Sequence, residues 1–168
     1  MVQIRTKVTL RRRGNLANHI AKIEKAVKGP TSVKAGFPAG RAGKDIVQIA
    51  VWQHFGTAGS GKPFKTERGG GFGGPIPPRP FITVAMFKGR RQVRNELRKQ
   101  AYDITVNGKP MAQALFALGS LGRDLIQKQI TSNMGPPNSP TTIRLKGSSG
   151  TLRDSGNMFQ ALTWAVDQ

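Results

Sequence analysis

The sequence predicts a protein of the α+β class, and three observations lead to this prediction. Short segments alternate apolar and polar side chains with a period of two residues, as half-buried strands do. Longer segments repeat apolar residues every three or four positions, as amphipathic helices do. The 168 residues include 21 glycines and 11 prolines, so we expect long loops between the elements. The length suits a single domain over residues 1–168 that carries extended arms.

Four segments are expected to be strands. Residues 2–10 and 31–38 show the side-chain pattern of strands that are covered on one face, and residues 161–166 are expected to form the last strand. Residues 45–56 are apolar on both faces, which favours a central strand that is covered on both sides.

Three segments are expected to be helices, and each has its own start or stop. Residues 15–28 begin at a capping asparagine and end before a Gly-Pro pair. Residues 81–104 carry apolar residues at helical spacing among many basic side chains. Residues 110–130 begin with a proline, which suits a first helical turn, and end before the segment MGPPNSP. A short helical turn is also expected at residues 157–160.

Three stretches are expected to be arms. They are a basic N-terminal strand and arm over residues 1–14, a Gly/Pro-rich loop over 56–80, and a Pro/Ser/Gly-rich segment over 134–156. The second arm passes abruptly from glycines to prolines, which hold a chain extended and remove backbone donors. We expect Arg79 to offer its planar fork to an acceptor there, and Phe81 to anchor the next helix to the core.

The charge is strongly unbalanced, with 27 Lys and Arg against eight Asp and Glu, or a net +19. Such a field favours a polyanion or an acidic protein surface as the neighbour. No motif for reading base sequence is evident, so a DNA contact would be independent of sequence. The alternatives are a solvated helix face and a face that docks on an acidic partner. The candidate contact residues form two clusters: Arg11, Arg12, Arg13, and Arg90, Arg91, Arg94, Arg98.

Several classes of protein are disfavoured by composition. The chain has no cysteine, which excludes disulfides and thiolate metal sites. It has no apolar run long enough to span a bilayer and no N-terminal segment of signal-peptide type, so we expect no membrane contact and synthesis in a cytoplasm. We also expect no cofactor and no metal.

One segment matches the consensus pattern of a nucleotide-binding motif. Residues 56–63, GTAGSGKP, fit the phosphate-loop pattern that ends in Gly-Lys. The next residue in that motif carries a hydroxyl for Mg²⁺ and begins a helix, whereas this chain has Pro63. We therefore expect the match to be a coincidence.

Other catalytic constellations are weakly supported. The eight carboxylates are scattered singly, and the two histidines are His19 and His54. A set of His54, Asp154 and Ser155 could be assembled, but no spacing or elbow motif supports it. We expect His54 to be packed or hydrogen-bonded beside its aromatic neighbours. The sequence thus predicts a protein that is not an enzyme.

A combination of four motifs resembles the neck and tail-completion proteins of tailed bacteriophages, a family of tail-terminator-like and head–tail joining proteins. In that family a strand that ends in an aromatic-Gly-Thr precedes an I-P-x-R-P-F segment, and a P-P-x-S-P-x-T-I segment precedes L-x-D-(T/S)-G and a final strand. The resemblance covers roughly residue 36 to the C-terminus. The matching segments here are Val51–Thr57, Ile76–Phe81, Pro136–Ile143 and Leu152–Gly156.

The resemblance implies a structural protein of the virion, assembled as a ring at the head–tail junction. Such proteins resemble α+β domains in which a small, mainly antiparallel sheet packs against two or three helices. The ring is usually six-fold, the genome passes through its lumen, and the partners are head-connector and tail proteins. No catalysis is implied. A basic, sequence-independent DNA-binding protein remains the alternative.

Ring assembly needs contact residues, and we expect them in the arms, over 56–75 and 134–153, because loops of this length gain order when a neighbour covers them. The candidate inter-subunit residues are Ile76, Pro78, Arg79, Phe81, Pro137, Ser139, Thr142 and Asp154.

Overall fold

The computed structural model describes residues 15–38, 40–67 and 69–167. In these residues it shows an α+β fold with six α-helices and two antiparallel two-stranded sheets, so the predicted fold class is confirmed. The strand expected at residues 2–10 lies outside the described residues. The helices are α1 Leu16–Ala26, α2 Lys44–Phe55, α3 Phe81–Tyr102, α4 Met111–Thr131, α5 Pro140–Lys146 and α6 Asn157–Ala161. The strands are β1 Ser32–Gly36, β2 Pro63–Thr66, β3 Gly69–Phe72 and β4 Thr163–Asp167.

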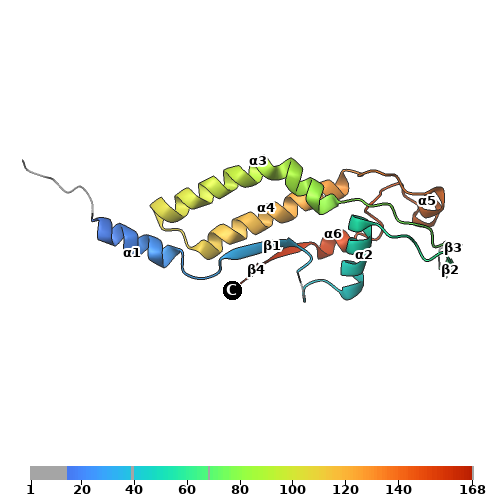
Figure 1. Cartoon of the computed structure of the whole chain (residues 1–168), viewed down its shortest axis with the longest axis horizontal. Helices are drawn as coiled ribbons and strands as arrows, with labels where there is room; N and C mark the ends of the chain where they lie inside the picture. The colour runs from blue at the N-terminus through green and yellow to red at the C-terminus, as the bar shows by residue number, and fades with distance from the viewer. Residues whose placement is uncertain (1–14, 39, 68, 168) are drawn as a thin grey trace, which may run out of the picture.

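The molecule is elongated, and its long axis follows the hairpin of α3 and α4 (Figure 1). α1 projects at one end, while α2, α5 and the β2–β3 hairpin gather at the other. A π-helical turn, Asp103–Asn107, ends α3 before the chain reverses into α4. Both long helices were expected from their apolar spacing, and both are confirmed.

The main core lies where α3 and α4 meet α2 and α6. Its fully buried large side chains are Phe81 at the start of α3 and Ile126 and Ile130 in the second half of α4. Gly89 lets the helices approach closely, because a Cβ there would lie 2.5 Å from a methyl of Leu125. The predicted role of Phe81 as a core anchor is therefore confirmed.

Strands β1 and β4 form an antiparallel pair, with Ser32 opposite Asp167 and Gly36 opposite Thr163. The pair lies along α4 (Figure 1). Gly119 of α4 makes this packing tight, because a Cβ there would lie 2.7 Å from the Trp164 ring. The strands expected at 31–38 and 161–166 are confirmed, and they join distant parts of the chain.

The central strand expected at residues 45–56 is wrong, because this segment is helix α2. Its N-cap is Gly43, and it stops before Gly56, whose positive φ of 77° ends the helix and whose N–H donates to the carbonyl of Trp52. The apolar residues on both faces suggested a strand, but a helix satisfies its own backbone groups without neighbouring strands. Only Ala50 is buried, so most of the large apolar side chains of α2 remain outside the core.

Helix α1 has the predicted start, with the Asn15 side chain accepting a hydrogen bond from the backbone N–H of Asn18 at 3.4 Å. Its Ala26 packs in a small second cluster with Ile104 and Ala114. Of its apolar stripe, Ile23 is half-buried, whereas Leu16 is 70% exposed. α1 is therefore an amphipathic helix without a partner for most of its apolar face.

Two segments expected to be irregular contain regular structure. The loop over 56–80 includes the β2–β3 hairpin, with Pro63 opposite Phe72. The segment 134–156 includes α5, which Ser139 caps through the N–H of Thr142 and which Gly147 ends at a φ of 68°. Loop-forming residues dominate the composition of this segment, but local capping allows part of it to form a helix.

The packing of β4 on α4 predicts the effect of a substitution at Gly119. Gly119→Val should lower the free energy of unfolding by about 1–3 kcal/mol, because the added methyl groups would overlap the Trp164 ring. Urea denaturation followed by circular dichroism measures this change. Gln113→Val, at an exposed position of the same helix, is the control and should change stability by less than about 0.5 kcal/mol. Equal stabilities for the two variants would contradict the packing.

Candidate functional site

The guanidinium group of Arg79 connects three segments at the α2 end of the molecule. Arg79 is 2% exposed. Its Nη1 donates to Oε1 of Gln53 at 2.9 Å, and its Nε donates to the carbonyl of Pro136 at 2.9 Å. Its Nη2 donates to the carbonyl of Pro137 at 3.3 Å and to Oδ1 of Asn138 at 3.2 Å. The expectation that Arg79 offers its fork to acceptors is confirmed, and the acceptors belong to the same chain.

The acceptors around this guanidinium are neutral carbonyl and amide oxygens. Burial lowers the pKa of Arg79 from its ordinary value, yet arginine remains charged at any pH the protein meets. The hydrogen bonds are therefore charge-assisted, and such bonds are stronger than neutral ones. The backbone N–H of Arg79 also donates to the carbonyl of Gln53 at 2.8 Å, so α2 is held at two points.

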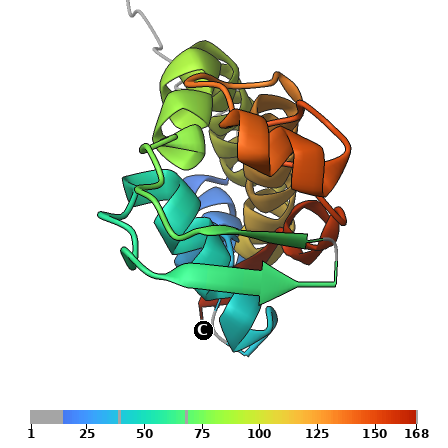
Figure 2. The same ribbon diagram turned by 90° about the vertical axis from the view of Figure 1, so that its right-hand side faces the viewer.

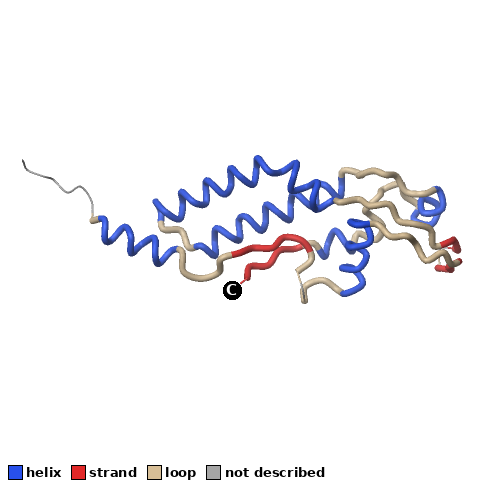
Figure 3. Tube along the Cα trace, viewed as in Figure 1, coloured by secondary structure: helices blue, strands red, loops and turns tan. Residues whose placement is uncertain are grey.

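The two expected arms pack on each other and form one protrusion. A Cβ on Gly71 of β3 would lie 2.9 Å from the Phe64 ring and 3.3 Å from the Thr141 methyl. Thr57 and Ile76 pair at the base of the hairpin through backbone hydrogen bonds of 2.9 and 3.0 Å. Figure 2 looks onto this end, with the hairpin strands in front, and Figure 3 shows how much of it is loop.

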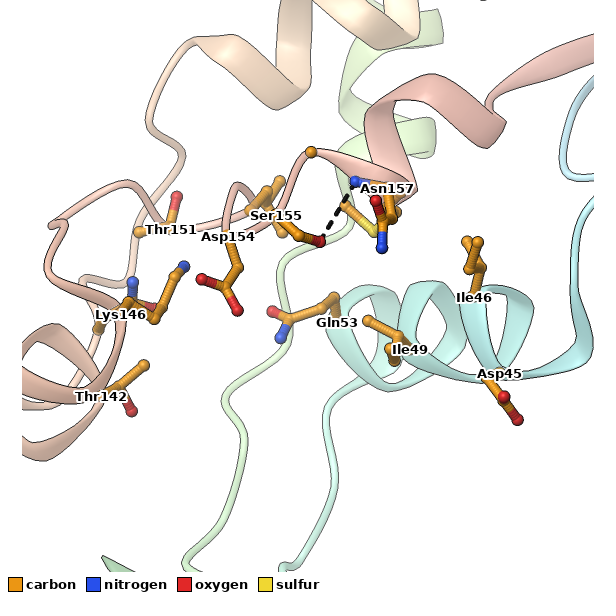
Figure 4. Close-up of a pocket in the computed structure, with 14 residues that line it drawn as sticks. Asp45, Ile46, Ile49, Gln53, Thr142, Lys146, Thr151, Asp154, Ser155 and Asn157 are labelled. Atoms are coloured by element: carbon orange, nitrogen blue, oxygen red, sulfur yellow. Dashed lines mark hydrogen bonds between the residues drawn. The ribbon is translucent and has the colours of Figure 1, made fainter. Parts of the chain in front are cut away.

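A pocket of about 460 Å³ lies between α2, α5 and the chain that leads into α6 (Figure 4). Ile46 and Ile49 of α2 line one side, and Lys146 and Asp154 lie near each other on the opposite side. Burial lowers the pKa of Lys146, the Asp154 carboxylate opposes this shift, and the charge of Arg79 adds to it. The Lys146 ammonium donates to the carbonyl of Gly150 at 2.7 Å, so the lysine closes the loop after α5.

The predicted inter-subunit residues divide into three groups by burial. Arg79 and Phe81 are buried within the chain, so their positions give them intrachain partners and no exposed surface for a neighbour. Ile76 and Thr142 are half-buried. The remaining four are exposed at this end of the molecule and keep their predicted role as contacts: Pro78, Pro137, Ser139 and Asp154.

Several residues of this region belong to no recognisable sequence motif. Gln53 and Asn138 both bind the guanidinium group, and neither residue type stands out in a sequence. The exposed aromatic residues of α2 were missed because their segment was assigned to a buried strand. Phe55 is 73% exposed and Trp52 is 42% exposed. A helix of 12 residues exceeds the usual length of a strand, and that length was the available indication.

His54 has the packed arrangement that the sequence predicted. Its ring makes edge contacts with Phe55 at 4.7 Å and Phe81 at 5.3 Å between centroids. Its Nε2 lies 3.3 Å from the hydroxyl of Thr83, and its buried Nδ1 has no hydrogen-bond partner among the described residues. His54 does not line the pocket that contains Asp154 and Ser155, so these three residues are not gathered at one site.

The phosphate-loop match lacks the geometry of that motif. Residue 63, directly after the lysine, begins strand β2 rather than a helix, so no helix N-terminus faces the glycines. Lys62 is exposed. The described residues contain no group of three or more His, Cys, Asp or Glu that could hold a metal ion. Within the described part of the chain, no helix is both long and apolar enough to span a membrane.

A second surface of interest lies on α3. Four of the predicted contact residues surround a hollow of about 470 Å³, together with Lys88 and Asn95. The structure therefore brings together the residues of the second basic cluster: Arg90, Arg91, Arg94 and Arg98. Arg11, Arg12 and Arg13 lie outside the described residues.

The comparisons with protein-family models, curated proteins and solved structures find no match to this chain. The fold class therefore rests on the structure itself, and the function is argued from its surfaces.

The Arg79 contacts predict a large loss of stability when the fork is removed. Arg79→Ala leaves four acceptors of a part-buried network without their donor and should cost about 3 kcal/mol of unfolding free energy. Arg79→Lys should recover little of this loss, because an ammonium group cannot reproduce a planar fork. Urea denaturation measures both, with the exposed Arg144→Ala on α5 as the control. A fully stable Arg79→Lys protein would contradict this prediction, because a positive charge without the planar fork would then be enough to hold the acceptors.

His54 predicts a pH dependence of stability. Burial lowers the pKa of His54 below its ordinary value of about 6.5. The unfolded chain therefore takes up a proton first, so the free energy of unfolding falls as the pH drops below about 6.5 until the lower folded-state pKa is passed. His54→Gln should flatten the profile measured by urea denaturation between pH 7.5 and 5. The control is His19→Gln, at an exposed position of α1, which should keep the pH dependence of the unfolding free energy. Loss of that pH dependence in His19→Gln would contradict the assignment to His54.

Proposed function

We propose that this chain is a structural virion protein that forms a ring at the head–tail junction of a tailed bacteriophage. The observation that carries the proposal is the presence of two unlike apolar patches at opposite ends of an elongated subunit. A head-to-tail interface joins two different patches at every junction and closes into a ring when the rotation between subunits allows it. An interface that joins identical patches would give a dimer instead.

The first patch is the exposed stripe of α1. Its members follow one another at helical spacing, so they lie on one face. Ile20 is 46% exposed and Val27 is 40% exposed, in addition to Leu16. An amphipathic helix with so little of its apolar face covered is only marginally stable alone, because most helical stability comes from packing.

The second patch is at the α2 end. It includes the exposed side chains of α2 and both aromatic residues of the hairpin, of which Phe72 is 64% exposed. Large exposed apolar side chains gathered at one end of a chain are typical of an interaction site. The members of the second patch are Ile49, Val51, Trp52, Phe55, Phe64 and Phe72.

The chain exposes more surface than a compact monomer of its mass, as a subunit with uncovered interfaces would. The whole chain exposes 12366 Å², whereas a compact monomer of this mass exposes about 8,100 Å². A ring subunit has two interfaces, and standard interfaces bury about 800 Å² per partner, or about 1,600 Å² together.

The motifs that resemble the phage family support the proposal through their positions. Three of the four motifs meet at Arg79: Gln53 belongs to the first, Arg79 to the second, and Pro136 to the third. The motif residues therefore hold the α2 end and its arms together. We infer from this that the motifs maintain the shape of one ring contact, which needs no catalytic group.

The proposal predicts a closed ring of six subunits. Analytical ultracentrifugation should give six times the 18.2-kDa subunit mass, and electron microscopy should show rings. Assembly should also protect the arms over 56–75 and 134–153 from proteolysis. Phe55→Ser should leave subunits unassembled but folded, whereas Leu97→Ser, at an exposed apolar position of α3, should leave the rings intact. A monomer at every concentration tested would contradict the proposal.

A particle-level experiment separates this function from other ring functions. Removing the protein from the virus that encodes it should give unjoined heads and tails. Normal joined particles would overturn the head–tail assignment even if the purified protein forms rings.

A second candidate is a basic, sequence-independent DNA-binding protein. The observation that favours it is the arginine-lined hollow on α3. A DNA-binding surface is also compatible with the ring, whose lumen would surround the viral genome.

A further inference from the structure

We propose that the arginine stripe of α3 binds the phosphodiester backbone of double-stranded DNA. The stripe consists of four residues, Arg90, Arg91, Arg94 and Arg98. The contact itself would be a property of one subunit, whereas its assignment to the genome in a channel rests on the proposed ring function.

The geometry of α3 places these guanidinium groups on one side of one rigid element. Residues four apart on a helix are neighbours, so Arg90, Arg94 and Arg98 form a row, and Arg91 flanks it. The row rises by about 12 Å, at 1.5 Å per residue. One DNA strand carries a phosphate about every 3.4 Å along the axis, so the row matches three or four successive phosphates.

The stripe faces outward because the other side of α3 is used for packing. Ala85 and Gly89 are buried toward the core and toward Leu125 of α4. The four arginines are exposed, and α3 forms an outer edge of the molecule with no described element beyond it (Figure 1). A long duplex can therefore approach the stripe without a rearrangement of the fold.

The positive charge of the stripe is not balanced by its own helix. α3 carries six Lys and Arg residues and one carboxylate, Glu96. Glu96 does not line the hollow and accepts a hydrogen bond from Gln100 instead. The ion pairs that the structure shows, Lys34 with Asp167 and Arg123 with Asp124, lie outside α3. Like charges four residues apart destabilise a helix, so an anionic partner would relieve a strain that the free subunit carries.

One arginine is already oriented. The guanidinium of Arg90 lies over the Phe87 ring at 4.3 Å from the centroid, and its Nη1 donates to the carbonyl of Phe87 at 3.0 Å. This contact reduces the freedom that Arg90 would lose on binding. It also covers one face of the aromatic ring nearest the stripe.

The chemistry of the stripe favours duplex DNA over the other polyanions. Arginine forks match phosphate oxygens in a bidentate manner. Single-stranded DNA is bound mainly by aromatic platforms on which bases stack, and here Arg90 already occupies a face of Phe87. A straight row of about 12 Å suits the regular spacing of a duplex better than an irregular acidic protein surface.

The test measures duplex binding of the full-length protein at several salt concentrations. Fluorescence anisotropy with a 24-base-pair duplex gives the slope of log K against log [NaCl]. Replacing all four stripe arginines by glutamine should make this slope shallower by about 3.6 for each bound subunit, at about 0.9 per phosphate contact. The same relation predicts a loss of affinity on the order of 10³-fold at 0.1 M NaCl.

The matched control removes four positive charges elsewhere. Lys28, Arg41, Arg144 and Arg153 are exposed and lie outside α3, and their glutamine variant has the same net charge as the stripe variant. It should keep the slope to within about one unit. Equal losses in the two variants would overturn the proposal, because binding would then follow net charge. Circular dichroism checks that both variants remain folded.

Competitors and a separate assembly measurement complete the design. Polyglutamate or single-stranded DNA that competes as well as the duplex at equal charge would also overturn the proposal. Rings without stripe-dependent DNA binding would refute this inference and leave the ring proposal standing. If the protein binds DNA through the stripe but never forms rings, the DNA-binding proposal is supported and the ring proposal is refuted.

Discussion

The fold of the α2 end depends on one buried guanidinium group. Arg79 is held by acceptors from α2 and from the segment that follows α4. The two arms, which run to the same end of the molecule, are thereby joined at their base. A buried charge is tolerated only when its donors are satisfied, so the same contacts that hold the arms also fix the path of the chain around Arg79. The hairpin and α5 can then pack on each other as one protrusion.

The elongated shape explains why so much apolar surface remains exposed. The described core is built mainly around Phe81, Ile126 and Ile130, with a small second cluster at the α1 end. A chain of this length that spreads its elements along one axis has little interior in which to bury the stripe of α1 or the aromatic residues of α2. These side chains are the two patches on which the ring proposal rests. The same shape leaves the outer face of α3 free for a long, charged partner.

Some elements were predictable because their determinants are local. The helices α1, α3 and α4 have apolar spacing and clear stops, and β1 and β4 have short alternating patterns. The roles of Arg79 as a donor fork and of Phe81 as an anchor follow from residue type and from the prolines around them. The sequence of helix α2 suggested a strand because its apolar residues cover every face. Such a pattern shows neither the period of a strand nor that of a helix, so periodicity cannot distinguish the two. The hairpin and α5 were missed because glycine, proline and serine dominate their composition.

The sequence by itself determined the fold class, the long helices, the charge and the absence of disulfides, since each depends on local pattern or composition. It also determined that the arginines of α3 share one side, because helical geometry alone places them there. Only the tertiary structure decided which oxygens receive the Arg79 fork, which apolar residues stay exposed and how the arms meet. Those outcomes depend on contacts between segments far apart in the chain, such as Gln53 with Arg79 and Arg79 with Pro136. Such contacts leave no periodicity in the sequence, because they arise from the packing of whole elements.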